Sequence, residues 1–264
     1  MKYFLHIAYN GSHFHGWQWQ TNAVTVQGVI EEKLQCIFKE KINVFGCGRT
    51  DSGVHASQYV FHITIEDVFD FDLKFRLNKH LPNSIVVYEI FEVSEKKHAR
   101  YHATSRTYDY FLHLYKDPVL GKHSSYYEID NLDLEAMQKA GDLISKYNNF
   151  EAACKQPHLY HDTICKVSFA KLYVDESQKR MRFTITANRF LRGMIRILVG
   201  YLLDVGKGKI SVAQFEDILA NQTKMDNKRV AYPNGLYLSK ITYDGITLQS
   251  QQDICSFLKI GLEG

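Results

Sequence analysis

The rest of the chain is organised around the segment Gly48-Arg49-Thr50-Asp51-Ser52-Gly53-Val54-His55-Ala56. It follows a short apolar run, Ile42 to Phe45, and precedes a strand-like run, Tyr59 to Ile65. Glycine tolerates positive φ and Asp favours turns, so the nine residues are predicted to form a loop between two strands. One carboxylate, Asp51, stands in this loop beside Arg49 and two hydroxyl side chains.

Asp51 is the candidate reactive group of the loop. A guanidinium and hydroxyl donors favour the charged form of a carboxylate, so we expect Asp51 to be an ionised nucleophile or electrostatic stabiliser rather than a general acid. The residues alone leave another interpretation open, in which Arg49 and Asp51 only pair with each other and the glycines only turn the chain. Polar groups gathered between two apolar strands favour function, because a rigid scaffold commonly holds functional loops.

The composition is that of an ordinary globular protein. The 264 residues suffice for one large domain or two modest ones, and 45% are hydrophobic and 23% charged. A formal net charge of +3 does not by itself establish a nucleic-acid partner. The five cysteines are an odd number without a signal peptide, so we expect reduced thiols in a cytoplasmic protein. The most apolar segment, 190–205, contains Arg192, Arg196 and Asp204, which argues against a membrane span.

The pattern of the first hundred residues predicts an α+β layer. Strands are expected at Tyr3 to Tyr9 and Ile85 to Val93, around the two strands that flank the Asp51 loop. Thr25 offers an N-cap for an amphipathic helix, and a short helix is expected from Asp72 to His80. Helices on one face of a mainly antiparallel sheet accommodate this order.

The remaining sequence predicts a second α/β half. We place the halves at residues 1–104 and 105–245, with a tail of unknown role at 246–264. The expected strands are Thr107 to Tyr115, Val167 to Val174, Met181 to Thr186 and Gly235 to Tyr243. The expected helices are Leu132 to Tyr147, Arg189 to Val205, and Ser211 to Ala220.

Arginines recur along the expected helix Arg189 to Val205. Arg189, Arg192 and Arg196 stand at i, i+3 and i+7, which would place them on one face of an otherwise buried helix. Such charges need anions beside them, and either phosphates or Asp51 would serve. For Arg189 and Arg192, pairing with surface Asp or Glu stays open.

Tyr108 is a second candidate site residue. Its ring could support a stacked base and its phenol could exchange a proton, although a strand tyrosine that fills the core is the alternative.

Two groups of residues raise the question of a metal site. His13 and His15 lack a companion carboxylate or cysteine. The second group, Cys154, His158, His161 and Cys165, lacks a Cys-x-x-Cys pair, so we expect no metal at either place.

Several motifs in order resemble those of the tRNA pseudouridine synthase A family. The loop Gly-Arg-Thr-Asp-Ser-Gly-Val-His resembles the family signature, whose Asp is catalytic. The further matches are Tyr9-Asn10-Gly11, Gly16-Trp17-Gln18, Gln20, Asn78, Leu81-Pro82, His98-Ala99-Arg100-Tyr101, Ala103-Thr104, Tyr108-Asp109-Tyr110, the run from Asn188 to Gly200, and Gly235-Leu236-Tyr237-Leu238. The resemblance spans Lys2 to Tyr243, and ordered motifs are more specific than one.

The resemblance implies roles for these residues. Asp51 would be the catalytic nucleophile, Arg196 would pair with it, and Tyr108 would lie against the target uracil. Arg49 would fill the space of a flipped-out uridine or bind the flanking phosphate. We expect further RNA contacts from Arg189, Arg192, Arg100 and His55.

The resemblance also implies a function and an assembly. The reaction would convert uridine to pseudouridine at positions 38, 39 and 40 of the tRNA anticodon stem-loop, with no cofactor and no metal. The fold would be the pseudouridine synthase fold, with a central RNA-binding cleft between two α/β halves, and the protein would be a homodimer. Asn10, Ser52 and Arg192-Gly193 depart from the common family pattern, which leaves the substrate breadth open.

Two other classes of function remain. A non-catalytic RNA-binding protein would explain the aromatic residues and arginines but would not need Asp51. A hydrolase of a nucleoside or glycoside would need a second carboxyl group about 5 to 10 Å away. The sequence offers no companion Asp or Glu in a comparable motif.

Overall fold

Strand β1 organises the first part of the chain. In this computed structural model, which describes residues 1–66, 69–223, 229–248 and 253–262, β1 (Lys2–Tyr9) pairs antiparallel with β3 (His55–Thr64) and with β4 (Ile85–Val93). Every residue of β1 from Phe4 onward is buried, because neighbouring strands flank it on both sides and its faces are covered.

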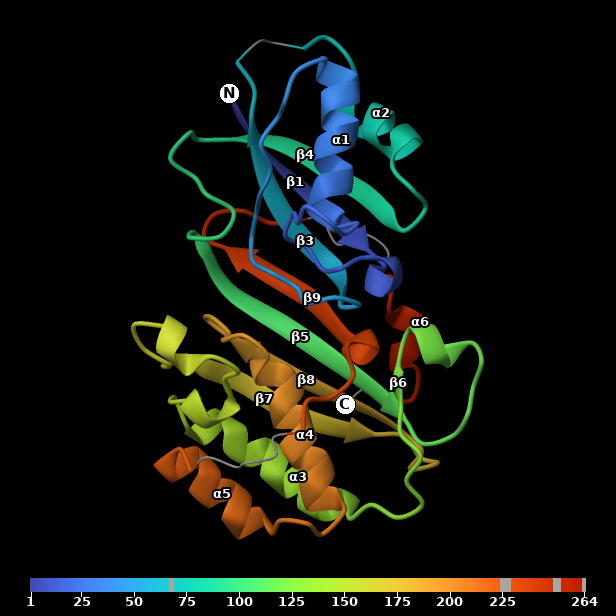
Figure 1. The fold of residues 1–264 in the computed structure, drawn as a ribbon, viewed down its shortest axis with the longest axis vertical. Helices are drawn as coiled ribbons and strands as arrows, with labels where there is room; N and C mark the ends of the chain where they lie inside the picture. Colours follow the sequence, from blue (N-terminus) through green and yellow to red (C-terminus); the bar gives the residue numbers. More distant parts are fainter. Residues whose placement is uncertain (67–68, 224–228, 249–252, 263–264) are drawn as a thin grey trace. The chain divides into compact units, whose positions relative to one another are not determined.

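Two helices cover one face of this sheet (Figure 1). Helix α1 (Val26–Phe38) starts as expected, since Thr25 Oγ1 accepts a hydrogen bond from the Gly28 N–H at 3.2 Å. It buries Val26, Ile30 and Leu34, which lie at helical spacing. Helix α2 (Leu73–His80) is capped by the side chain of Asp72.

The chain divides into two compact units. The first unit comprises Met1–Thr104 and Tyr237–Cys255, and the second comprises Ser105–Leu236 and Ser256–Gly264. The predicted division differs from this one at residues 237–255. Residues 237–245 were expected in the second half and 246–255 in the tail, whereas both belong to the first unit. The reason is that β9 (Leu236–Tyr243) pairs with β3, where Tyr237 lies opposite His55. The strand order in the first unit is therefore β4-β1-β3-β9, with β9 parallel to β3.

Three strands of the second unit pair antiparallel. Their order is β5 (Ala103–His113), β8 (Arg180–Ala187) and β7 (Val167–Val174), so the predicted hairpin of the last two strands is confirmed. The short β6 (Ser125–Tyr126) runs parallel to β5.

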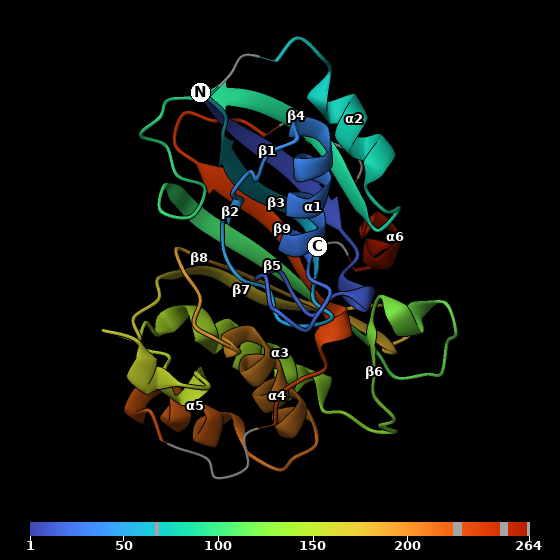
Figure 2. The ribbon, with the colours of Figure 1, turned by 45° about the horizontal axis from the view of Figure 1, so that its top comes forward.

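Three helices, α3 (Leu134–Leu143), α4 (Met194–Gly206) and α5 (Val212–Asn221), lie over one face of this sheet (Figures 1 and 2). Ser211 caps α5 through a capping box with Gln214, close to the predicted start of that helix. The fold class of the described chain is α+β, as predicted.

The start of α4 differs from the prediction. The helix begins at Met194 rather than at Arg189, because Gly193 adopts a φ of +73° that an α-helix does not contain. Residues 189–193 are extended or turned, and the Arg192 carbonyl accepts a hydrogen bond from the Lys155 N–H at 3.1 Å. Arg189, Arg192 and Arg196 therefore do not share one helical face.

The remaining elements are short. They are β2 (Phe45–Gly46), α6 (Ser256–Lys259) and the 3-10 turns Gly11–His13, Leu120–Lys122, Ile144–Lys146, Glu151–Ala153, Pro157–Leu159 and Pro233–Gly235. Within the described ranges, no helix is both long and apolar enough to cross a bilayer.

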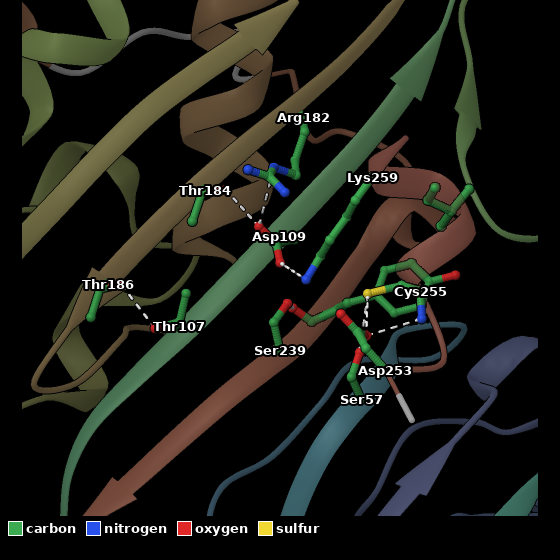
Figure 3. Close-up of polar contacts among 12 residues, drawn as sticks. Ser57, Thr107, Asp109, Arg182, Thr184, Thr186, Ser239, Asp253, Cys255 and Lys259 are labelled. Carbon is green, nitrogen blue, oxygen red and sulfur yellow. Dashed lines mark hydrogen bonds and ion pairs between the residues drawn. The ribbon is translucent and has the colours of Figure 1, made fainter. Parts of the chain in front are cut away.

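Within the second unit, α6 packs on β5 through a cluster of charged groups (Figure 3). Lys259 Nζ of α6 lies 3.8 Å from Asp109 Oδ2 on β5, and Arg182 Nε of β8 lies 3.9 Å from Asp109 Oδ1. The Thr184 hydroxyl donates to the same carboxylate at 2.5 Å. Arg180 donates to the Leu258 carbonyl at 2.7 Å, so the segment is bound through its backbone as well.

Candidate active-site loop

The Asp51 loop spans residues 47–54 in the first unit. The strand before it is shorter than predicted, since β2 contains only Phe45 and Gly46. The strand after it is longer, because His55 and Ala56 already pair with β9 as the first residues of β3. Asp51 is partly exposed and Arg49 is exposed, so both side chains stand at the surface of the unit.

Backbone hydrogen bonds tie the loop to the opening segment of the chain. The Trp17 N–H donates to the Thr50 carbonyl at 3.2 Å, and the Gly53 N–H donates to the Phe14 carbonyl at 3.1 Å. Within the loop, the Val54 N–H donates to the Asp51 carbonyl at 3.2 Å. The backbone on both sides of the Asp51 side chain is therefore fixed, which limits the entropy lost when a substrate is positioned.

Glycines allow this close approach. Gly16 has a φ of +84°, and a Cβ at this position would lie 2.4 Å from the Thr50 carbonyl oxygen. A Cβ at Gly11 would lie 2.0 Å from the Val54 carbonyl oxygen. Within the loop, Gly53 adopts the expected positive φ of +77°, whereas Gly48 does not. This role of Gly11 and Gly16 was not predicted. Two glycines within six residues of the opening motif were the feature of the sequence that could have indicated it.

An aromatic stack supports the loop from within. Trp17 stacks on Tyr59 with ring centroids 4.0 Å apart, and the Tyr59 hydroxyl donates to the Gly48 carbonyl at 2.5 Å. Trp17 is 2% exposed, so it packs in the core rather than stacking on bases, whereas Trp19 is 53% exposed. Trp17 is therefore a core residue, whereas Trp19 is accessible to a ligand.

His55 is held inside the first unit by a ring stack and a hydrogen bond. Its ring is fully buried and stacks on Tyr237 with centroids 4.4 Å and planes 12° apart. Its Nδ1 accepts a hydrogen bond from the Gly11 N–H at 3.1 Å, which ties the opening segment to the start of β3. A contact between His55 and RNA stays a prediction, and in this arrangement the His55 ring has no accessible surface.

Arg100 lies on the exposed turn between β4 and β5 in the first unit. Its N–H donates to His98 Nδ1 at 3.0 Å, and its guanidinium carbon lies 5.8 Å from the ring centroid of Tyr101. This position agrees with the accessibility that an RNA contact requires.

Tyr108 and Arg196 belong to the second unit. Tyr108 is a partly exposed residue of β5, and the edge of its ring meets Phe190 at 5.1 Å and 80°. Arg196, on the first turn of α4, donates from Nε to the Ala231 carbonyl at 2.7 Å, and the Ala231 N–H donates back to its carbonyl at 2.9 Å. The segment before β9 therefore fixes the direction of the Arg196 side chain.

Two buried tyrosines, which the sequence analysis did not single out, hold that segment. The Tyr110 hydroxyl lies 2.9 Å from the Tyr127 hydroxyl and 2.9 Å from the Tyr232 carbonyl oxygen. Burial, and then the neighbouring Tyr127, raise the pKa of Tyr110 well above its ordinary value, so its hydroxyl stays protonated. The signal in the sequence was the alternation of Tyr108 and Tyr110, which places both on one face of β5.

The other two arginines are paired within the second unit. Arg189 forms an ion pair with Asp162 at 3.2 Å, the surface pairing that the sequence left open. Arg192 is exposed and its guanidinium donates to the Gln156 side chain.

The candidate metal ligands are not gathered. Among the described residues, no group of three or more His, Cys, Asp or Glu side chains is placed to hold a metal ion. Cys154 and Cys165 are buried, whereas His158 and His161 are exposed. Burial raises the pKa of the Cys165 thiol to about 11, which disfavours the thiolate that a metal would need.

Comparison with known proteins identifies the family. Residues 6–102 and 147–244 match the family model described as tRNA pseudouridine synthase. The chain is 38% identical over 245 residues to the tRNA pseudouridine synthase A of Bacteroides fragilis, covering 92% of this chain and 96% of the relative. It is 37% identical over 246 residues to that of Porphyromonas gingivalis, covering 92% and 97%, and 34% identical over 241 residues to that of Acetivibrio thermocellus, covering 90% and 98%. With a matched model over most of its length and relatives of this similarity, the chain belongs to the tRNA pseudouridine synthase A family, a family of isomerases.

Proposed function

We propose that this enzyme isomerises uridine to pseudouridine at positions 38, 39 and 40 of the tRNA anticodon stem-loop, with Asp51 as nucleophile. The observation that carries the proposal is the Asp51 loop. It presents a partly exposed carboxylate on a backbone fixed by Trp17 and Phe14. A reactive group held in this way needs little reorganisation when the substrate arrives.

The reaction exchanges one bond for another within the same nucleotide. The bond from the sugar C1′ to uracil N1 breaks, the base turns, and C1′ joins C5, whose proton is then lost while N1 gains one. The ionised Asp51 carboxylate attacks or stabilises the electron-poor centre that forms when the first bond breaks.

Three further residues support this chemistry in the proposal. The uridine must leave the RNA helix at a cost of roughly a few kcal/mol, and the exposed Arg49 takes the vacated space or binds the flanking phosphate. Tyr108 holds the uracil ring and accepts or relays the C5 proton. Arg196 stabilises negative charge in the reaction through its planar guanidinium, a geometry that lysine does not reproduce.

The choice of region rather than sequence follows from backbone and shape recognition. Exposed Arg100 and Arg192 are suited to phosphate contacts, which fix the register of an RNA without reading its bases. We further propose that the protein acts as a cytoplasmic homodimer on tRNA.

The test uses unmodified tRNA transcript with tritium at C5 of uridine. The native protein is expected to release label and leave pseudouridine at positions 38 to 40. Asp51→Asn is expected to lower the rate at least about 10³-fold, because it removes the reacting group. Asp70→Asn, an exposed Asp of the first unit outside the loop, is the matched control and should keep the native rate.

Each other outcome contradicts a defined part of the proposal. If neither the native protein nor Asp51→Asn releases label although both bind tRNA, the chain is a non-catalytic RNA-binding protein. Release of free uracil would indicate a hydrolase. Pseudouridine outside positions 38 to 40 would leave the enzyme in place and refute its position specificity.

A further inference from the structure

A row of aromatic rings reaches the surface of the first unit. Phe45 of β2 stacks on His62 of β3, with ring centroids 5.0 Å apart and planes 18° apart. His98 meets His62 edge-on at 4.5 Å, and the Tyr101 ring lies 4.4 Å from that of His98. We name these residues, Phe45, His62, His98 and Tyr101, the aromatic row.

Both ends of the aromatic row are open to solvent. Phe45 is 47% exposed and Tyr101 is 74% exposed, whereas His62 between them is 3% exposed. Large aromatic rings gain free energy when another flat or apolar group covers them. The row therefore has a buried support and exposed faces on which such a group can lie.

The turn that carries His98 and Tyr101 is fixed in place. The Ala99 N–H donates to His62 Nδ1 at 3.3 Å, and the Tyr243 hydroxyl donates to the Ala99 carbonyl at 2.7 Å. The Arg100 N–H donates to His98 Nδ1 at 3.0 Å. A surface that is already ordered loses little conformational entropy on binding.

The two histidines act as neutral rings at physiological pH. Burial, followed by the charges of His98 and Lys2, lowers the pKa of His62 to about 4. Burial and Lys2 also lower the pKa of His98. Neutral rings stack on a planar group without the cost of burying a charge.

Permanent cations lie on the turn that carries His98 and Tyr101. The turn contains Lys96, Lys97 and Arg100 against one acid, Glu95, and the Arg100 guanidinium carbon lies 5.8 Å from the Tyr101 ring centroid. Lys2 joins this group, since its Nζ donates to the Lys97 carbonyl at 3.1 Å. Exposed rings beside cations match a nucleotide, which combines a planar base with an anionic phosphate. An aliphatic protein segment would cover the rings but would offer no negative charge to these cations.

We propose that the aromatic row binds an unpaired nucleotide of the tRNA, with its base stacked on Tyr101 and its phosphate at Arg100. The inference rests on the proposed tRNA substrate and deepens it. This nucleotide is not the uridine that reacts, and its binding does not involve Asp51.

Equilibrium binding tests the inference without turnover. Dissociation constants for fluorescent unmodified tRNA are measured by anisotropy in the Asp51→Asn protein, with and without Tyr101→Ala. Loss of one stacked base is expected to weaken binding by about 10- to 100-fold, and Tyr101→Phe should keep the parent affinity. Arg100→Ala should weaken binding and lower the slope of log Kd against log salt by about one phosphate contact.

Phe75 and Lys79 of α2 provide a matched control. Phe75 is 58% exposed and Lys79 Nζ lies 5.5 Å from its ring centroid, so this is an exposed ring beside a cation in the same unit that does not belong to the stacked aromatic row. Phe75→Ala should leave the affinity for tRNA unchanged. Thermal melts of each variant verify the fold, which the exposed Tyr101 side chain should not affect.

Three outcomes would overturn the inference. If Tyr101→Ala keeps the parent affinity for tRNA, the aromatic row does not bind tRNA. In that case, pseudouridine formation by the native protein would still support the proposed function. A changed oligomeric state in light scattering, with unchanged affinity for tRNA, would make the row a protein interface. If the native protein neither binds nor modifies tRNA, the inference and the proposed function both fail.

Discussion

The Tyr9 hydroxyl lies 2.9 Å from Thr50 Oγ1, and both residues are buried. This hydrogen bond connects β1 to the residue that precedes Asp51. The first strand of the fold therefore holds the side of the loop on which the candidate nucleophile stands.

Removing this hydroxyl tests the connection. Tyr9→Phe leaves the Thr50 hydroxyl without that partner, so we expect a loss of about 1 to 2 kcal/mol in the free energy of unfolding and a lower kcat. Urea unfolding and single-turnover kinetics measure the two effects. Tyr3→Phe is the control on the same strand, since its hydroxyl makes a weak contact with Met1 Sδ at 3.5 Å, and it should change neither quantity. Equal effects of the two variants would contradict the connection.

Gly16 is expected to be indispensable for the loop. Gly16→Ala places a Cβ 2.4 Å from the Thr50 carbonyl oxygen at a φ of +84°, so either the loop shifts or the backbone is strained. We expect a loss of about 2 kcal/mol or more in stability and a strong fall in kcat.

Gly48→Ala is the matched control within the same loop. Apart from Gly48 itself and its two chain neighbours, no atom of the described residues lies within 4 Å of a Cβ built at Gly48. Pseudouridine formation should therefore remain near the native rate. If Gly16→Ala behaved like Gly48→Ala in the tritium-release assay, the opening segment would not position the loop.

Gly200 positions Arg196 indirectly. On α4, a Cβ at Gly200 would lie 2.0 Å from the Arg229 carbonyl oxygen. Gly200→Ala is expected to displace the segment whose Ala231 carbonyl accepts the Arg196 Nε hydrogen bond, and so to lower kcat. The helical control is Gly141→Ala on α3, where the nearest atom lies at 3.7 Å. This control should raise stability by about 0.5 to 1 kcal/mol, because alanine favours helices over glycine. An unchanged kcat for Gly200→Ala would remove the positioning role.

Asp109 balances two cations in the second unit. Its side chain is 5% exposed and lies near Arg182 and Lys259, so Asp109→Asn leaves both cations with less compensation. We expect a loss of about 2 to 3 kcal/mol in the free energy of unfolding. Asp142→Asn, at an exposed position of α3, should stay within about 0.5 kcal/mol of the native protein. Comparable urea midpoints for the two variants would show that the cluster contributes little.

His62 makes the stability depend on pH. Its folded pKa of about 4 is below the unfolded value of 6.5, so the unfolded chain binds more protons between these values. The contribution of His62 is complete above pH 6.5 and is lost as the pH falls toward 4. We expect a loss of about 2 kcal/mol in the free energy of unfolding over this window. His62→Asn keeps an acceptor for the Ala99 N–H but does not titrate, so its stability should fall less between pH 7 and 4. Parallel pH profiles of the two proteins would contradict this assignment.

The local elements and the candidate nucleophile could be predicted from the amino-acid sequence. Thr25 and Ser211 cap helices where expected, because an N-cap hydrogen bond involves residues only three apart. The hairpin of β7 and β8 follows from residues close in the chain. The Asp51 loop stood out because Gly, Asp and Arg gather between two apolar runs.

How those elements combine depends on contacts between residues that are distant in the chain. The pairing of Tyr237 with His55, and the contacts of Gly11 with Val54 and Gly16 with Thr50, join residues far apart in the chain, so no local pattern encodes them. The same pairing buries His55, which the sequence could not distinguish from an accessible loop residue. The start of α4 was hidden for another reason. The spacing of the arginines imitates a helix, while the positive φ of Gly193 starts the helix only at Met194.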